Sequence, residues 1–170
     1  RSSDLFSDTS KQEDQARAMS DLVRSKGGIF IVNDSIKLAK LSHADGVHLG
    51  CQDIDLRAAR EELSNKSFIG ASCYGNITLA VEAKEKGADY VAFGSFFFST
   101  TKPHAPKIDP SIIGEARSLI DLPVVGIGGI TVTNAKLLVQ AGVDAIAISS
   151  GLFDAGDIKN SVKIFKTYFN

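Results

Sequence analysis

Several short apolar runs in this chain are followed at once by residues that could do chemistry. Carboxylates, hydroxyls, an amide, one lysine and a pair of glycines share this placement. They are Asn33, Asp34, Asp53, Ser72, Ser99, Thr100, Thr101, Lys102, Gly128, Gly129, Ser149 and Ser150. Carboxylate oxygens suit Mg²⁺, while hydroxyls, ammonium groups and glycine backbone N–H groups suit phosphate. These residue types therefore predict a site for phosphate and a divalent cation.

The apolar runs that precede these residues read as buried β-strands. They are IFIVN (29–33), GVHLG (46–50), FIGAS (68–72), YVAFG (90–94), VVGIG (124–128) and AIAIS (145–149). Each run is about five residues long and shows little alternation, which is typical of parallel strands covered on both faces.

Helix-compatible stretches separate the runs. They span 11–26, 35–42, 55–63, 78–87, 111–120 and 133–142. Strict alternation of strand and helix predicts an α/β fold. The segments LSHADGVHLG, EKGADYVAFG and QAGVDAIAIS also resemble one another, and such repetition favours a barrel or a doubly wound sheet.

In parallel α/β folds, ligands bind at the carboxyl ends of the strands, so the polar residues above should meet at one rim. The segment GSFFFSTTKPHAP (94–106) lengthens one strand-to-helix connection, and long ordered insertions there are usually functional. Each feature also has a simpler explanation. Asp34 or Asp53 could cap a helix, the glycines could serve packing, and Lys102 could be a solvated surface residue. His48, inside an apolar run, fits a buried polar contact better than a metal ligand.

Composition limits the remaining possibilities. The 170 residues are 44% hydrophobic with a net charge of −1, which predicts one domain over residues 1–170 and gives no bulk reason to expect nucleic acid or a membrane as partner. No apolar run approaches the length of a membrane span. Two cysteines, Cys51 and Cys73, without zinc spacing indicate a reducing compartment, so we expect a soluble cytoplasmic protein that binds small phosphorylated molecules. A homo-oligomer remains open.

Taken in order, the segments IVND, GVHLGCQD, IGAS, GSFFFSTTK, GIGGI and AISSGLF resemble the thiamine-phosphate synthase family. The resemblance implies a (βα)8 TIM barrel. It also implies a Mg²⁺-dependent transferase that joins 4-amino-2-methyl-5-hydroxymethylpyrimidine diphosphate to a thiazole phosphate, releasing pyrophosphate. In that family the C–O bond of the pyrimidine substrate breaks with much cation character, and the thiazole nitrogen then attacks. Such chemistry needs positioning and charge stabilisation rather than a nucleophilic side chain.

The resemblance also implies roles for individual residues, with Lys102 and Ser72 as the catalytic candidates. Arg1, Asn33, Ser72 and Lys102 would bind the pyrimidine diphosphate, Ser99, Thr100, Thr101, Gly129, Ser149 and Ser150 the thiazole phosphate, and Asp34 and Asp53 the Mg²⁺.

This chain departs from the family pattern at several places. Cys51 replaces a Gln, Ser99 and Thr100 replace Thr-Pro, and Ser3 stands where a Lys is usual two residues after Arg1. Six strands are visible where eight are expected. We therefore expect a barrel whose first strand and helix, and most of its second strand, are absent from this sequence. An open barrel is less favourable because it leaves two strand edges unpaired.

Two other functions stay open at this point. A relative with the same barrel isomerises the thiazole phosphate, but it has a His soon after the serine of the IGAS segment, where this chain has Cys73 and Tyr74. A catalytically silent paralogue that binds a thiamine precursor or serves as a regulator is the second alternative.

Overall fold

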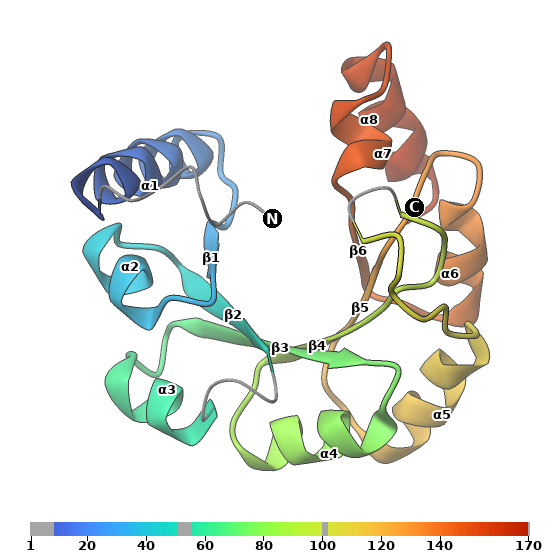
Figure 1. The fold of residues 1–170 in the computed structure, drawn as a ribbon, viewed down its shortest axis with the longest axis horizontal. Helices are drawn as coiled ribbons and strands as arrows, with labels where there is room; N and C mark the ends of the chain where they lie inside the picture. Colours follow the sequence, from blue (N-terminus) through green and yellow to red (C-terminus); the bar gives the residue numbers. More distant parts are fainter. Residues whose placement is uncertain (1–8, 51–55, 100–101, 170) are drawn as a thin grey trace.

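A computed structural model describes residues 9–50, 56–99 and 102–169 of the chain, and helices alternate with strands up to the last two helices, which follow each other directly (Figure 1). The strands of the described part are β1 (Ile31–Asn33), β2 (Gly46–Gly50), β3 (Phe68–Tyr74), β4 (Tyr90–Phe93), β5 (Val124–Ile127) and β6 (Ala145–Ala147). The helices are α1 (Thr9–Ser25), α2 (Ile36–Leu41), α3 (Leu56–Glu62), α4 (Ile77–Glu85), α5 (Ser111–Leu119), α6 (Ala135–Ala141), α7 (Ser150–Phe153) and α8 (Ile158–Thr167). The predicted α/β class is confirmed.

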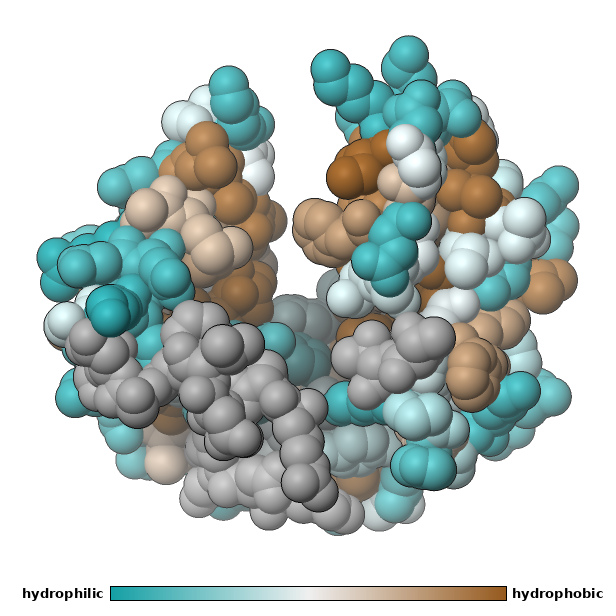
Figure 2. Space-filling view, turned by 45° about the horizontal axis from the view of Figure 1, so that its top comes forward, coloured by the Kyte–Doolittle hydropathy of each residue, from teal (hydrophilic) through white to brown (hydrophobic). Residues whose placement is uncertain are grey.

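The strands form one sheet in the order β1-β2-β3-β4-β5-β6, and every neighbouring pair is parallel. The sheet curves into a half-barrel with α1 to α6 on its convex side (Figure 1). Its two ends face each other across a hollow whose opposing walls carry apolar side chains (Figure 2). None of the helices in the described ranges is both long and apolar enough to cross a membrane.

The sequence predicted a strand at each of the six observed positions, but it missed α7 and α8. Asp157 gives the clearest missed signal, because its side chain accepts a hydrogen bond from Asn160 N–H at 2.9 Å and caps the beginning of α8. An N-cap residue before an amphipathic stretch is a recognised helix start. The helix α7 is only four residues long, which is too short for a periodic pattern.

The hydrophobic core lies between the sheet and the outer helices. Val47, Leu49, Ile69 and Val91 are fully buried on the strands, and alanines face them from the helices. The core alanines of the helices are Ala39, Ala59, Ala80, Ala83, Ala116 and Ala135. Small helical residues let each helix pack close to the sheet. The intervening strand residues therefore lie on the concave face.

Three aspartates, each just before an even-numbered strand, tie that strand to its neighbour. Asp89 Oδ2 accepts a hydrogen bond from Ile69 N–H at 2.7 Å, and Asp89 N–H donates to the Ile69 carbonyl, also at 2.7 Å. The equivalent distances are 2.8 and 2.8 Å between Asp45 and Phe30, and 2.7 and 2.9 Å between Asp144 and Val124.

An arginine from an odd-numbered helix completes each arrangement, which we call a strand-end clamp. Arg60 pairs with Asp89 at 2.5 Å and donates to the Gly87 carbonyl at 3.0 Å. Arg24 bonds Asp45 and the His43 carbonyl in the same way, and Arg117 bonds Asp144 and the Gly142 carbonyl. Gly87 and Gly142 have φ of 87° and 100°, as expected for the end of a helix, and His43 adopts the same left-handed conformation at 53°. The clamps thus account for the repeated sequence segments.

Folding also changes the acidity of a clamp carboxyl. Partial burial works to raise the pKa of Asp144, but hydrogen bonds from Arg117 and from Val124 N–H outweigh it and hold that pKa below its usual value. A carboxyl whose pKa falls on folding stabilises the fold above its unfolded pKa, and the stabilisation is lost as the pH falls through the folded pKa. This clamp therefore weakens in acid.

We expect Asp89→Ala to lower the free energy of unfolding by about 1–2 kcal/mol, because Ile69 N–H and the Arg60 guanidinium lose a shared acceptor. Urea denaturation followed by circular dichroism measures the change. Asp121→Ala is the matched control, since Asp121 pairs with Lys84 on the surface and its side chain is 80% exposed. Its urea midpoint should stay at the wild-type value. Equal midpoint shifts for both variants would show that the clamp does not stabilise the fold more than a surface ion pair does.

Candidate active site

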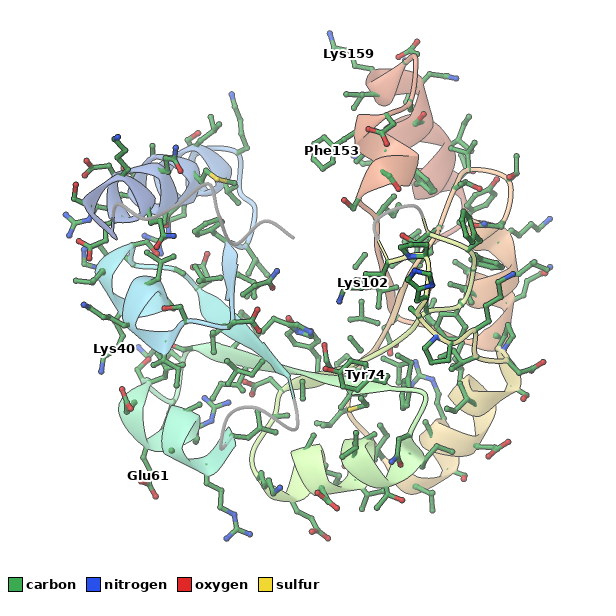
Figure 3. All side chains as sticks on the ribbon, in the orientation of Figure 1. Lys40, Glu61, Tyr74, Lys102, Phe153 and Lys159 are labelled. Atoms are coloured by element: carbon green, nitrogen blue, oxygen red, sulfur yellow. The ribbon has the colours of Figure 1, made fainter. Side chains whose placement is uncertain are left out.

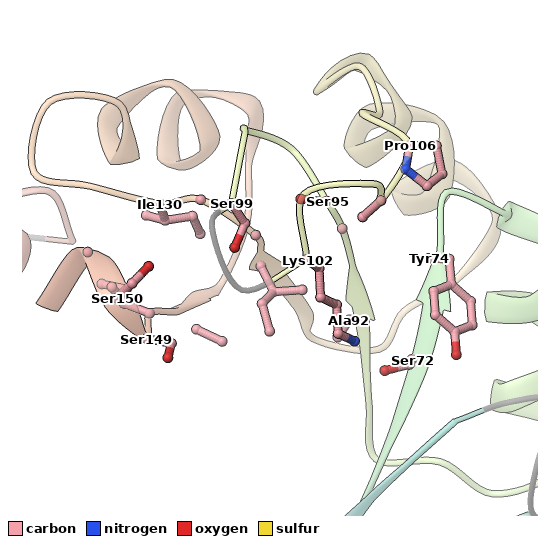
Figure 4. A pocket seen from close by; sticks show the side chains of 18 residues that line it. Ser72, Tyr74, Ala92, Ser95, Ser99, Lys102, Pro106, Ile130, Ser149 and Ser150 are labelled. Carbon is pink, nitrogen blue, oxygen red and sulfur yellow. The ribbon is translucent and has the colours of Figure 1, made fainter. Parts of the chain in front are cut away.

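A cavity of about 430 Å³ opens at the carboxyl ends of β3 to β6. Its polar lining comes from separate segments of the chain. It comprises Ser72, Tyr74, Ser95, Ser99, Lys102, Ser149 and Ser150. Ser99, Ser149 and Ser150 gather at one side of the cavity, Ser72 and Tyr74 lie at the other, and the Lys102 side chain lies between them (Figure 4). Because parallel strands bring their carboxyl ends to one edge, the sequence predicted that polar residues after the strands would meet at one rim. The cavity brings together five of them, Ser72, Ser99, Lys102, Ser149 and Ser150, whereas Ser95 and Tyr74 were not predicted.

The lengthened connection after β4 packs against the connection after β5. Phe96 N–H donates to the Ile127 carbonyl at 3.3 Å, and Phe97 N–H donates to the Gly128 carbonyl at 3.0 Å. The Phe96 side chain is buried in the core. The aromatic run therefore fastens this connection to the sheet, and the segment carries Ser99 and Lys102 to the cavity.

The close contact between these two connections requires glycine at position 129. Gly129 has φ of 63°, and a Cβ there would lie 2.1 Å from the Phe98 carbonyl oxygen. The packing explanation for this glycine is thus confirmed. The same approach leaves the backbone of Gly128 and Gly129 lining the cavity, where a bound anion would meet no Cβ.

The electrostatics of the cavity favour an anion. Lys102 is exposed and forms no ion pair with any residue in the described ranges. No carboxylate is among the described residues that line the cavity. The Lys102 and Tyr74 side chains point to the concave side of the sheet, whereas Lys40, Glu61 and Lys159 point outward (Figure 3).

Ser72 belongs to a hydrogen-bonded network on the concave face. His48 Nε2 lies 2.8 Å from Ser72 Oγ, and His48 Nδ1 lies 3.0 Å from the Tyr90 hydroxyl. The His48 and Tyr90 rings stack with centroids 5.5 Å apart. Burial lowers the pKa of His48, although the Asp34 carboxylate offsets part of this, and burial raises the pKa of Tyr90 to about 12. The buried polar contact predicted for His48 is confirmed.

Sequence reasoning missed the partners of His48 because they depend on strand register. His48 pairs with Gly70 on β3, and Gly70 pairs with Tyr90 on β4, so the three positions form one row across the sheet. A Cβ on Gly70 would lie 2.0 Å from the Tyr90 ring. The missing side chain at Gly70 is therefore what lets the ring cross β3 and reach His48. The only sequence signal was an isolated glycine within a strand.

Asn33 ends β1, Asp34 follows it, and neither residue lines the cavity. Asn33 pairs with His48 in the sheet, which places it next to the network. Asp34 has φ of 61°, and its N–H donates to the His48 carbonyl at 2.9 Å. Ser35, rather than Asp34, caps α2 by accepting a hydrogen bond from Leu38 N–H at 3.1 Å. Helix capping is therefore not the role of Asp34.

Some predicted residues lie outside the part of the chain that the structure describes. They are Arg1, Asp53, Thr100 and Thr101, together with the divergent Ser3 and Cys51. Within the described ranges, no three His, Cys, Asp or Glu side chains are grouped as a metal site. Tyr74 was not predicted as a site residue, yet it lines the cavity with a φ of 52°. This backbone conformation is unusual for an aromatic residue, and such conformations cluster at functional sites as well as at turns.

Comparisons with known proteins agree with this geometry. A family model described as thiamine monophosphate synthase matches residues 3–152. The thiamine-phosphate synthase of Acidithiobacillus ferrooxidans is 42% identical over 167 residues, covering 98% of this chain and 77% of that protein. The protein of that name from Thiobacillus denitrificans is 48% identical over 158 residues, covering 93% and 75%.

Solved structures give the same answer at the level of the fold. The thiamine phosphate pyrophosphorylase from Pyrococcus furiosus superposes with a TM-score of 0.86 at 31% identity, covering 97% of this chain and 79% of that one. A 3-hexulose-6-phosphate synthase from Salmonella typhimurium superposes with a TM-score of 0.70 at 17% identity, covering 92% and 79%. The second likeness shows the fold alone.

We expect Gly129→Ala to lower the free energy of unfolding by about 1 kcal/mol or more, because alanine is strained at positive φ and its Cβ would displace the Phe98 carbonyl. Hydrogen exchange of the Phe97 amide should accelerate, since that amide bonds the neighbouring Gly128 carbonyl. Gly114→Ala is the control, because a Cβ on this α5 residue meets nothing within 4 Å. A Gly129→Ala protein with wild-type stability and exchange would refute the packing requirement.

Proposed function

This chain belongs to the thiamine monophosphate synthase family, and on that premise we propose that it catalyses the thiamine-phosphate synthase reaction in the cavity described above. It is a transferase that joins a pyrimidine diphosphate to a thiazole phosphate, giving thiamine phosphate and pyrophosphate. The observation that carries the assignment is the meeting of Ser72, Lys102 and the Ser149-Ser150 pair in one cavity, from three separate segments.

The two sides of the cavity suit the two phosphorylated substrates. The thiazole phosphate binds where Ser99, Gly129, Ser149 and Ser150 offer hydroxyls and backbone. The pyrimidine diphosphate binds toward Ser72, with Asn33 beyond it. The position of the Lys102 side chain between the two sides supports this division (Figure 4).

Catalysis rests on positioning and on charge. When the C–O bond of the pyrimidine substrate breaks, the diphosphate keeps the electron pair and negative charge grows on its oxygens. The Lys102 ammonium stabilises that charge. The thiazole nitrogen then attacks the methylene carbon, and the cavity holds the two rings in line.

Asp34 fits a Mg²⁺ ligand. Its carboxylate is exposed at the rim, does not cap α2, and accepts no hydrogen bond from the described residues. Mg²⁺ is commonly held by one or two carboxylates with substrate phosphates and water completing the shell. Asp53, outside the described ranges, is the proposed second ligand. When bound, the ion supplies positive charge that neutralises the diphosphate.

The complete fold is proposed to be a (βα)8 barrel. Within the described residues β1 and β6 each pair on one side only, and the walls between them are apolar (Figure 2). Two further parallel strands would pair both edges and cover these walls. Arg1, outside the described ranges, is the proposed cationic ligand of the diphosphate.

A coupled assay tests the function. The full-length protein, given the pyrimidine diphosphate, the thiazole phosphate and Mg²⁺, should form thiamine phosphate, which is followed by its fluorescence after oxidation. Asp34→Asn should raise the Mg²⁺ concentration needed for half-maximal rate by about tenfold or more, since a carboxylate ligand becomes neutral. Asp154→Asn, on the surface after α7, should not. No product from folded wild-type protein that binds thiazole phosphate would favour an isomerase or a silent paralogue.

Lys102→Ala should lower kcat by about a hundredfold while changing thiazole phosphate binding less than twofold, because the ammonium acts mainly on charge that develops as pyrophosphate leaves. Steady-state kinetics and equilibrium binding give the two numbers. Lys107→Ala removes an exposed lysine from the same connection but away from the cavity, and serves as the control. Equal losses of binding and turnover would rule out this role for Lys102.

A further inference from the structure

In the network of His48, Ser72 and Tyr90, the chemistry of the three side chains decides which group donates each hydrogen bond and which accepts it. Both ring nitrogens of His48 lie within hydrogen-bond distance of a hydroxyl. A neutral imidazole has one donor nitrogen and one acceptor nitrogen, and the partner of one nitrogen decides the state of the other. The two hydroxyls therefore cannot play the same part.

The Tyr90 phenol is the better donor of the two hydroxyls. Phenols are far more acidic than the alcohol of serine, and the phenol oxygen is a poorer acceptor because its lone pair is delocalised into the ring. The Tyr90 O–H accordingly donates to Nδ1, which leaves the proton of His48 on Nε2. His48 Nε2–H then donates to Ser72 Oγ over 2.8 Å.

This direction determines what Ser72 can offer a ligand. Its oxygen already accepts the hydrogen bond from His48, and within the described residues its hydroxyl has no other hydrogen-bond partner. The Ser72 hydrogen is left to point into the cavity that Ser72 lines. Hydrogen bonds in a chain polarise one another, so the two upstream donors make Ser72 a stronger donor.

We propose that His48 and Tyr90 are positioning residues that hold Ser72 as a hydrogen-bond donor toward an acceptor atom of the pyrimidine diphosphate. The proposal rests on the proposed function for the identity of the acceptor. Ser72 therefore acts as a donor that aligns or stabilises this substrate, and His48 does not activate it as a base. Gly70 is required for the same network, because its missing side chain leaves the space through which Tyr90 reaches His48.

The tautomer of His48 can be read directly. Long-range ¹H–¹⁵N spectra of protein labelled at histidine distinguish Nε2–H from Nδ1–H, and the His48→Gln spectrum assigns the His48 signals among the three histidines. We expect the Nε2–H form in the wild-type protein and a mixture of tautomers in Tyr90→Phe. Tyr168→Phe is the matched control, since its hydroxyl donates to the Val132 carbonyl at 2.8 Å, away from the network. A wild-type His48 in the Nδ1–H form would overturn the proposal.

Kinetics test the consequence for the reaction. Tyr90→Phe should lower kcat about tenfold with the KM for thiazole phosphate unchanged, and Tyr168→Phe should match the wild type. His48→Gln, whose amide N–H falls near the position of Nε2, should retain more activity than His48→Asn, whose amide falls near Nδ1. Melting temperatures separate these effects from loss of folding.

Wild-type turnover in Tyr90→Phe, or equal activity of the two His48 variants, would overturn the proposal. The spectra do not depend on the assigned reaction. Absence of thiamine phosphate from the wild-type protein would therefore count against the proposed function, while the spectra still decide the direction of the network.

Discussion

The strand-end clamps hold the register of the sheet, and the geometry at the opposite end of the strands depends on that register. Asp89 exchanges two hydrogen bonds with Ile69, which fixes where β4 begins relative to β3. Side chains alternate between the two faces of a strand, so a slip of one residue would move Tyr90 from the concave face to the core. The contact of Tyr90 with His48, and through it the orientation of Ser72, therefore depends on the clamp formed by Asp89, the residue just before Tyr90.

Local sequence predicted the strands well because each is a short apolar run in a chain of polar helices. The clamps were harder to foresee. The repeated segments contained Asp45, Asp89 and Asp144, but their partners are backbone groups 15 or 20 residues away and arginines 21 to 29 residues away. At the end of α2, His43 takes a left-handed conformation that glycine usually supplies, and the hydrogen bond that Arg24 donates to the His43 carbonyl helps to hold it there. Tertiary contacts of this kind cannot be predicted from the pattern of neighbouring residues in the sequence.

In the site, too, features that depend on local sequence were predicted, and features that depend on strand pairing were not. That polar residues follow parallel strands was enough to bring Ser72, Lys102 and Ser149 into one cavity. The network behind Ser72 was not foreseen, because it needs a particular pairing of three strands and the absence of a side chain at Gly70. The same limit explains why Tyr74 was overlooked, since its place in the cavity follows from a register shift near the end of β3.

The ion pairs are distributed unevenly between the two ends of the strands. Within the described residues, Arg24, Arg60 and Arg117 are paired with carboxylates at the amino-terminal ends of the strands. At the carboxyl ends, Lys102 and Asp34 pair with no described residue. Each charge held in a clamp is already neutralised and stabilises the fold, whereas a charge left at the rim retains its full attraction for a ligand. A diphosphate could contact Lys102 directly and Asp34 through a bound cation, and both charges would then be neutralised. Ligand binding would thus form ion pairs at the rim, just as folding forms them at the amino-terminal ends of the strands.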